Sequence, residues 1–494
     1  MGYVLTIDQG TTGTTVSLLN KDGFQVSKIN KEFQQIFPQP GWVEHNANDI
    51  WNSVLYGIEK VLEKSQLTGA DIDTIGITNQ RETVVLWDKS TGQPLYNAIV
   101  WQCRRTTEFC KSLKKKGLEK TIKSKTGLVV DPYFSASKIN WLLNNVKGLK
   151  AKLKNKQVAC GTIDSWLLYK LTGGEAHKTD VSNASRTQLM NLKTLNWDID
   201  LLKIFKVPFD ILPQIVPSNS DFGKTKNIGI IPDGIAINAL IGDQQSALFG
   251  QACFSPGEAK CTFGTGSFIL MNTGEKLVRS HSGLLTTVGW QLKGGKKAVY
   301  ALEGGAFICG AAVQWLRDNM HFVDHAAEIE RLALSVDSTD GVELIPAFTG
   351  LGAPYWQPQA RGLICGLTRG TQRGHIARAT LEGMALQNVD ILVAMEKDLK
   401  KKMPKLKVDG GASENNLLMQ MQSDYLGVKL QRPAFIETTA AGAGYLAGLG
   451  AGIWKSMNEI KQIYKLDREF KSQIPPLKRK ERLKSWHQAV KRSF

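Results

Sequence analysis

Short apolar runs separated by polar turns dominate the first part of the chain. Residues 4–7, 15–19 and 25–31 are three such runs, and Lys21-Asp22-Gly23 forms a turn sequence, so we predict a three-stranded meander. In residues 49–64 the apolar positions recur every three or four residues, which predicts a helix. Residues 72–78 and 83–87 are further predicted strands, after which helices and strands alternate up to residue 241.

The second half of the chain repeats this order. Predicted strands cover residues 260–263, 267–272, 284–289 and 405–408, and predicted helices cover residues 306–319 and 376–397. Strands that alternate with helices predict an α/β fold. We place the change of domain near residues 250–257, where Gly and Pro cluster, and expect a cleft between the two domains.

Small residues recur at every fourth position near the end of the second half. They are Ala440, Gly444, Gly448 and Gly452. We predict a helix here that packs closely on a sheet, because small side chains allow a near approach of the two backbones.

A glycine-threonine turn opens each half. Residues 8–14 (DQGTTGT) follow the first predicted strand, and residues 263–267 (FGTGS) end the strand at 260–263. Each stretch predicts a β-hairpin whose turn carries free backbone N–H groups and small hydroxyls, which suits phosphate binding. Two such turns, half a chain apart, indicate a duplicated fold that closes on a nucleotide from both sides.

Two carboxylates stand at predicted strand ends. Asp8 ends the first strand, and Asp243 ends the apolar run of residues 235–242. In α/β folds, strand ends face the ligand crevice. Two such acids suit magnesium-assisted phosphoryl transfer, in which one holds hydrated Mg²⁺ and the other accepts a proton from the attacking hydroxyl. The alternative is that each caps a following helix.

Polar and aromatic residues mark a candidate substrate pocket. Residues 79–82 (NQRE) follow a predicted strand and offer amides, a guanidinium and a carboxylate, which suits a small polyol with donor and acceptor hydroxyls. The alternative is a surface ion pair. Trp101 and Tyr133 supply an apolar wall or, alternatively, belong to the core.

A glycine pair follows the predicted strand at 405–408. In residues 409–416 (DGGASENN) it permits close approach to a flat ring, which Asn415 is placed to bond, although a plain turn explains the pattern equally well.

The chain carries a net charge of +17 at pH 7. Lysines cluster at residues 111–120, 147–156, 400–407 and 478–484, without the interleaved aromatics or recognisable module of a nucleic-acid binder. We interpret these clusters as solvated helix faces and expect no nucleic acid as a partner.

The cysteines and histidines indicate neither disulfides nor zinc. The seven cysteines are scattered and form no CxxC pair, which is typical of a reducing compartment, and the seven histidines show no metal-ligand spacing. No apolar run approaches the roughly 18 residues that a membrane helix needs. We therefore expect a cytoplasmic protein without a stable membrane anchor.

Several stretches together resemble the glycerol kinases of the FGGY carbohydrate kinases. They are residues 7–12 (IDQGTT), 40–45 (PGWVEH), 76–83 (GITNQRET), 97–102 (NAIVWQ), 131–135 (DPYFS), 183–187 (NASRT), 242–247 (GDQQSA) and 346–351 (PAFTGL). The resemblance implies two duplicated actin-like (ribonuclease H-like) α/β domains, residues 1–250 and 251–494, with a central cleft. It also implies ATP-dependent phosphorylation of glycerol to sn-glycerol 3-phosphate with Mg²⁺, in glycerol catabolism, by a homodimer or homotetramer.

The same resemblance implies a role for each matched residue. Asp243 is the general base, and Asp8 lies near Mg²⁺, with water between them. Glycerol is held by Arg81, Glu82, Trp101, Tyr133, Asp243, Gln244 and Phe268. ATP or ADP is bound by Thr11, Thr12, Gly13, Thr265, Gly310, Gln314, Gly411 and Asn415.

The chain departs from the family pattern in its first turn. Gly13-Thr14-Thr15 stands where these kinases commonly have two hydroxyl residues and an arginine. Residues 226–233 match no known regulatory loop of the family, so we carry over no regulation.

Three other functions are weighed against this interpretation. Another FGGY sugar or polyol kinase is the nearest. A chaperone-like ATPase would need an appended peptide-binding domain, for which the sequence has no room. Nucleic-acid binding rests on the charge alone.

Overall fold

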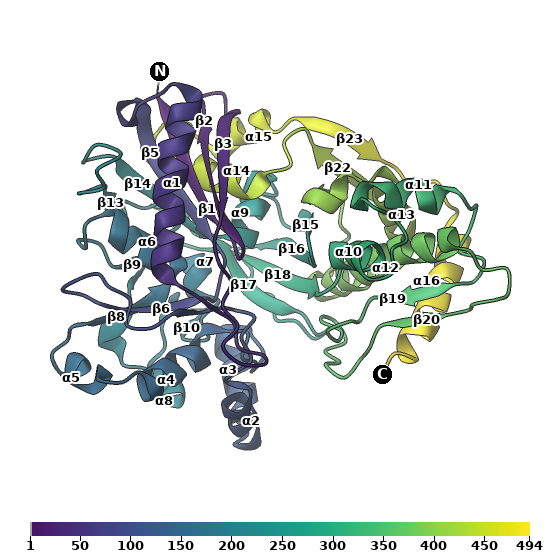
Figure 1. The fold of residues 1–494 in the computed structure, drawn as a ribbon, viewed down its shortest axis with the longest axis horizontal. Coiled ribbons are helices and arrows are strands. Elements are labelled where there is room, and N and C mark those ends of the chain that lie inside the picture. The colour runs from purple at the N-terminus through teal and green to yellow at the C-terminus, as the bar shows by residue number, and fades with distance from the viewer. Residues whose placement is uncertain (1) are drawn as a thin grey trace.

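The computed structural model describes residues 2–494 and has two lobes, each built around a mixed β-sheet (Figure 1). The first sheet has the strand order β13-β14-β5-β1-β2-β3, and the second has the order β17-β18-β16-β15-β21-β22-β23. The first sheet contains β13 (Gly223–Lys224), β14 (Ala236–Gly242), β5 (Ile72–Asn79), β1 (Tyr3–Gln9), β2 (Gly13–Leu19) and β3 (Gln25–Glu32). The second contains β17 (Leu285–Trp290), β18 (Val299–Ala306), β16 (Ser267–Gly274), β15 (Ala259–Phe263), β21 (Lys405–Asp409), β22 (Lys429–Pro433) and β23 (Leu466–Phe470).

The two sheets repeat one arrangement. In the first, β1 is antiparallel to β2 and parallel to β5; in the second, β15 is antiparallel to β16 and parallel to β21. Both sheets therefore place a hairpin beside a parallel strand, which confirms the duplicated α/β fold.

Smaller sheets complete the two lobes. They are β4 (Glu44–His45), β7 (Ala98–Ile99), β6 (Val84–Asp88) and β8 (Val158–Thr162); β9 (Lys178–Asp180) with β12 (Gln214–Val216); β10 (Met190–Asn191) with β11 (Asn196–Trp197); and β19 (Glu343–Ile345) with β20 (Leu363–Cys365).

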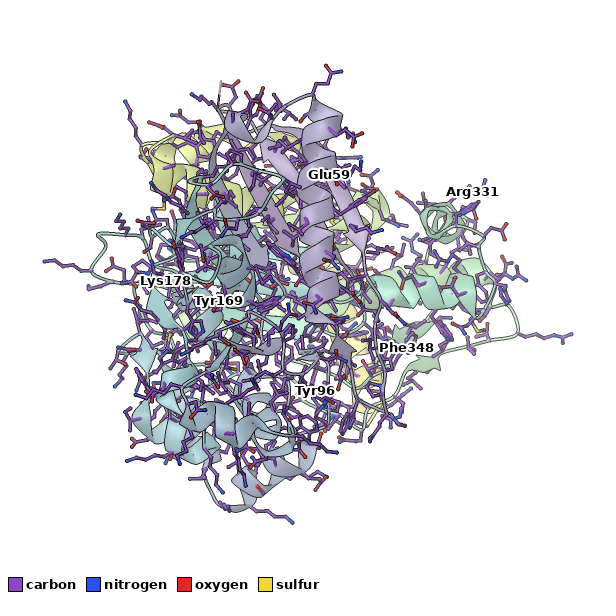
Figure 2. All side chains as sticks on the ribbon, turned by 60° about the vertical axis from the view of Figure 1, so that its left-hand side comes forward. Glu59, Tyr96, Tyr169, Lys178, Arg331 and Phe348 are labelled. Carbon is purple, nitrogen blue, oxygen red and sulfur yellow. The ribbon has the colours of Figure 1, made fainter. Side chains whose placement is uncertain are left out.

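Helices surround the sheets, and their side chains fill the space between the ribbons (Figure 2). Those before residue 251 are α1 (Ala47–Ser65), α2 (Thr107–Lys115), α3 (Glu119–Thr126), α4 (Ser135–Asn145), α5 (Leu149–Lys154), α6 (Ile163–Leu171), α7 (Val181–Ala184), α8 (Ile199–Phe205) and α9 (Asp243–Gly250). The rest are α10 (Gly310–Asp318), α11 (Ile329–Leu334), α12 (Arg373–Leu399), α13 (Asn416–Leu426), α14 (Thr438–Ala451), α15 (Met457–Ile463) and α16 (Pro476–Lys491).

One predicted helix begins later than expected. The prediction for residues 306–319 is wrong at its start, because Ala306 is the last residue of β18 and α10 starts only at Gly310. The strand β18 itself was not predicted. Glu303, Gly304 and Gly305 interrupt its apolar pattern, although the strand is mostly buried between β16 and β17.

The predicted small-residue helix is α14, which ends at Gly452 in a left-handed conformation. Its glycines allow close contact: a Cβ at Gly444 would lie 2.3 Å from Leu19, and one at Gly448 would lie 2.2 Å from the Trp454 ring. Leu19 belongs to β2, so α14 packs on the first sheet, and this prediction is confirmed.

The same helix crosses α9 at very short range. A Cβ added at Gly442 would lie 1.9 Å from the Ser246 carbonyl oxygen, and one at Gly250 would lie 2.1 Å from that of Thr438. Because α9 in turn packs on strands of the second sheet, this crossing joins the two lobes.

The lysine clusters lie on separate elements. Those at 111–120 and 147–156 fall largely on α2, α3 and α5, and that at 478–484 falls on α16, as predicted. The cluster at 400–407 differs, since it runs from the end of α12 into β21, where Lys407 is buried. Within residues 2–494 there is no helix with the length and apolar character needed to cross a bilayer.

The crossing of α9 and α14 gives a stability prediction. Gly442→Ala should lower the free energy of unfolding by about 1–3 kcal/mol, because the new methyl group overlaps a backbone carbonyl that cannot turn away. Calorimetry should show a lower Tm. Gly370→Ala is the matched control, since its Cβ would come no closer than 3.7 Å to Thr368. An equal Tm for both variants would contradict the prediction.

Candidate active site

Each of the two predicted phosphate turns is closed by a backbone hydrogen bond between two glycines, which stand three residues apart in the first turn and two apart in the second. Gly10 N donates to Gly13 O at 2.9 Å in the β1–β2 turn, and Gly264 N donates to Gly266 O at 2.9 Å in the β15–β16 turn. Thr12 and Thr265 are both exposed at the tips. Each hairpin therefore presents a threonine hydroxyl and turn N–H groups to a ligand.

Asp8 and Asp243 lie at the same edge of the first sheet. Strands β1 and β14 flank β5 and run parallel to it, so their carboxyl ends meet there. Gly242 is the N-cap of α9 and Asp243 is the first helical residue, so Asp243 is not the cap. Burial, together with the negative charges of Asp243 and Glu437, raises the pKa of Asp8 to about 8.

A buried network of charges surrounds Asp243. Arg81 Nε lies 3.1 Å from Asp243 Oδ1, and its two Nη atoms donate to the Glu303 carboxylate at 2.6 and 2.9 Å. Arg186 donates to Glu82 at 2.6 Å and to Glu303 at 3.0 Å. Arg81 and Glu82 are at most 3% exposed, which excludes the surface ion pair considered as an alternative.

Charge pairing keeps Glu303 ionised, whereas burial raises the pKa of Glu82 in spite of Arg186 and Arg81. Burial alone raises the pKa of Glu303, but the positive charges of Arg186 and Arg81 outweigh that effect and bring it to about 2. Glu82 also has a φ of 62°, in the left-handed region that a glutamate rarely adopts. Such strain persists only where the surroundings fix it, and it gathers at functional sites.

Sequence reasoning did not assign Glu303 or Arg186 to the site. Arg186 lies in a stretch that carried the family resemblance, and Glu303 is a charged residue within the unpredicted strand β18. A lone acid in an apolar strand is a usable signal, because it is costly to bury without a partner.

The three predicted wall residues come together. The ring centroids of Trp101 and Tyr133 are 5.4 Å apart and those of Trp101 and Phe268 are 6.4 Å apart, both edge to face. Trp101 Nε1 also donates to Thr11 Oγ1 at 2.9 Å. The aromatic wall is thus directly bonded to the first phosphate turn.

Gln244 follows Asp243 in α9. Its side chain is largely buried, and its Oε1 accepts a hydrogen bond from Lys260 Nζ at 2.5 Å. The Nε2 donor has no partner among the described residues.

The four predicted adenosine residues flank the second hairpin. Gly310 N donates to Gly264 O at 2.9 Å, and a Cβ at Gly310 would lie 3.9 Å from Ala412. A Cβ at Gly411 would meet nothing within 4 Å, so space is open beside it. Asn415 caps α13 through its Oδ1, and Gln314 is exposed on α10.

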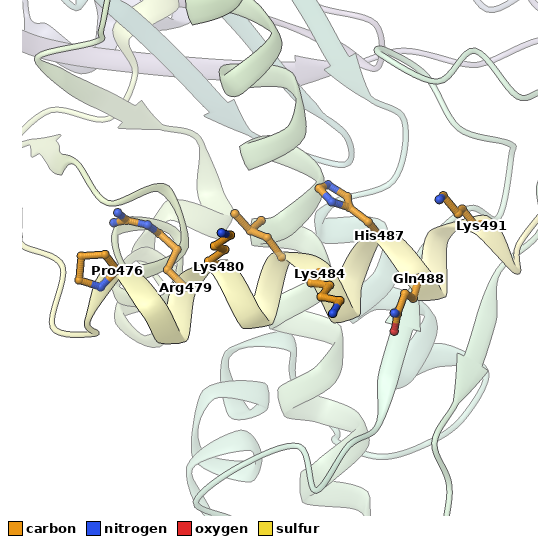
Figure 3. Close-up of a pocket in the computed structure, with 8 residues that line it drawn as sticks. Pro476, Arg479, Lys480, Lys484, His487, Gln488 and Lys491 are labelled. Carbon is orange, nitrogen blue, oxygen red and sulfur yellow. The ribbon is translucent and has the colours of Figure 1, made fainter.

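One groove lies away from these residues. It has a volume of about 660 Å³ and runs along α16 between basic side chains such as Lys480, Lys484 and Lys491 (Figure 3). All of its lining residues belong to this one surface helix, so it is a space between solvated side chains.

Comparison with known proteins identifies the family of the chain. Residues 3–250 match the N-terminal domain of the FGGY family of carbohydrate kinases, and residues 259–451 match its C-terminal domain. A glycerol kinase from Bdellovibrio bacteriovorus is 59% identical over 99% of both chains, and one from Symbiobacterium thermophilum is 52% identical over 100% of this chain and 98% of its own.

Solved structures of carbohydrate kinases match the fold of this chain. The structure of Plasmodium falciparum glycerol kinase with ADP matches with a TM-score of 0.93 and 40% identity, covering 100% of this chain and 98% of the other. A xylulose kinase from Lactobacillus acidophilus shares the fold, with a TM-score of 0.87 at 22% identity over 100% and 97% of the two chains. On these matches, the chain belongs to the FGGY family of carbohydrate kinases.

Proposed function

We propose that this chain transfers the γ-phosphoryl group of ATP to glycerol and releases sn-glycerol 3-phosphate and ADP. The observation that carries the proposal is the buried Arg81, which is joined to Asp243 at the edge of the sheet where the first phosphate hairpin also ends. Full-length relatives named glycerol kinase, at 52–59% identity, support the same substrate.

Asp243 acts as the general base. Its side chain is 28% exposed, so it is open to a substrate, while Arg81 Nε fixes its orientation at 3.1 Å. As the terminal hydroxyl oxygen of glycerol forms a bond to the γ-phosphorus, Asp243 accepts the hydroxyl proton and the bond between that phosphorus and the β–γ bridging oxygen breaks.

The remaining pocket residues bind and orient glycerol. Arg81 supplies donors and Glu82 supplies acceptors for its hydroxyls, and Gln244 has a free amide donor. Trp101, Tyr133 and Phe268 cover the carbon chain and exclude water, which would otherwise compete for the phosphoryl group.

The nucleotide lies between the two hairpins. We assign the first hairpin, with Thr11, Thr12 and Gly13, and all of the glycerol residues except Phe268 to residues 1–250. We assign Thr265 and the adenosine residues Gly310, Gln314, Gly411 and Asn415 to residues 251–494. Both hairpins carry an exposed threonine at the tip, Thr12 and Thr265, which supports this division of the phosphate contacts.

The residues present fit a magnesium ion carried by ATP. The Asp8 carboxylate forms no hydrogen bond or ion pair within residues 2–494, and no group of three His, Cys, Asp or Glu side chains in that part of the chain could hold a metal alone. Mg²⁺ usually binds through one or two carboxylates, substrate phosphates and water. When bound, it would neutralise phosphate charge, and Asp8 would hold it through water.

We also propose a cellular location and an assembly for the enzyme. Cysteines 103, 110, 160, 253, 261, 309 and 365 are free thiols, which supports a reducing compartment and hence the cytoplasm. We also propose that the chain forms a homodimer or homotetramer, as the resemblance to glycerol kinases implies.

The role of Asp243 is tested by Asp243→Asn. This variant keeps the shape of the side chain but cannot accept the proton, so kcat should fall by about 10²–10⁴-fold while glycerol binding weakens less. A coupled ADP-release assay measures kcat, and calorimetry checks the fold. Near-normal turnover would remove Asp243 from its role.

The substrate is tested by comparing kcat/KM for glycerol, dihydroxyacetone, xylulose and gluconate. The value for glycerol should be the highest, by at least about tenfold over xylulose and gluconate, because the full-length relatives that this chain resembles are named glycerol kinase. A preference for xylulose or gluconate would make this chain a different FGGY kinase.

The metal is tested by chelation. EDTA should reduce turnover by at least about 100-fold, and excess Mg²⁺ should restore it. Asp8→Asn should raise the Mg²⁺ concentration needed for half-maximal rate, because one negative charge is lost. Full activity in EDTA would contradict the proposed use of Mg²⁺.

A further inference from the structure

Lys260 is a fully buried lysine at the meeting of the two lobes. It lies within β15 and has 0% exposure. Its Nζ donates to Gln244 Oε1 at 2.5 Å and to Thr262 Oγ1 at 2.8 Å. One partner belongs to α9, directly after Asp243, and the other lies at the end of β15, so the ammonium group spans the lobes.

The bonding of Lys260 differs from that of the other buried cations nearby. Arg81 and Arg186 pair with carboxylates, whereas both partners of Lys260 are neutral, and no carboxylate lies within ion-pair distance of it in the described chain. Burying an unpaired charge is costly, and burial lowers the pKa of Lys260 while Asp409 and Asp243 act to raise it. A contribution to folding stability therefore does not explain why a lysine stands at this position.

The two hydrogen-bond partners of Lys260 are close in sequence to the proposed glycerol and phosphate sites. Gln244 is a glycerol residue in the proposed function and is adjacent to the base. Thr262 pairs across the hairpin with Phe268 of the aromatic wall, and the second phosphate turn begins two residues later, at Gly264. A shift of either partner would move the glycerol pocket relative to the hairpin.

We propose that Lys260 is a positioning residue for phosphoryl transfer, which clamps Gln244 and the start of α9 to the second phosphate hairpin. This inference rests on the proposed function. These hydrogen bonds fix the position of the base relative to the phosphate turn. Small displacements of reacting groups can lower the rate by a large factor.

The test compares Lys260→Met with Lys407→Met. Lys407 is the matched control, because it is the cross-strand partner of Lys260 and is also buried, but its Nζ donates to the backbone carbonyls of Gln251 and Ala252. Lys260→Met should lower kcat with glycerol by about 10–100-fold, the size expected for losing hydrogen bonds from a charged group. Lys407→Met should lower Tm similarly and change kcat by less than about threefold.

A double variant separates positioning from general damage. If Lys260 acts through Gln244, adding Gln244→Leu to Lys260→Met should cost little beyond the larger single effect. Lys260→Gln, a smaller change, is measured in parallel in case the methionine variant does not fold.

Three results would overturn the inference. They are a kcat within about twofold of wild type for the Lys260 variants, effects that multiply fully in the double variant, and an equal loss of kcat in Lys407→Met. A wild-type enzyme that fails to phosphorylate glycerol would instead refute the proposed function, so the two failures are distinguishable.

Discussion

The buried pairing of Arg81 with Glu303 holds the site together. Arg81 follows β5 of the first sheet and Glu303 lies in β18 of the second, 222 residues away along the chain. Removing one partner of such a pair typically costs about 3–5 kcal/mol, because a charge is left buried and uncompensated. The same guanidinium lies 3.1 Å from Asp243, so the residue that ties the lobes together also orients the proposed base.

The crossing of α9 and α14 determines where this bond can form. Helix α9 begins with Asp243 and packs on the second sheet, while α14 packs on the first. Glycines bring the two helix backbones together at Gly250 and Gly442. Because Asp243, the proposed base, starts one of the crossing helices, a movement between the lobes would displace its carboxylate.

The spacing of apolar residues predicted strands and helices well in segments where a single spacing, helical or alternating, was kept throughout. The hairpins, α1, α12 and α14 are of this kind. The pattern could not predict β18, because Glu303 is explained only by its pairing with Arg81 and Arg186. The two glycines after it are explained only by close packing, since a Cβ at Gly304 would lie 2.5 Å from Ile391. The same holds for Lys260, whose partner Gln244 lies in another element. Ion pairs between residues far apart in the chain produce no regular spacing in the sequence. Their residues therefore interrupt the apolar pattern, and the reason becomes clear only in the folded structure.

The departure at Gly13-Thr14-Thr15 can be understood through the same charge balance. Thr14 Oγ1 is hydrogen bonded to Ser53 Oγ at 2.7 Å, and Thr15 pairs across the hairpin with Asp8. An arginine at position 15 would place a cation on the strand beside Asp8; threonine does not, and burial and neighbouring acids leave the pKa of Asp8 raised to about 8. The nearby Lys28 is already paired with Glu437. In the proposed function, positive charge at this turn therefore arrives with the nucleotide, as its metal ion.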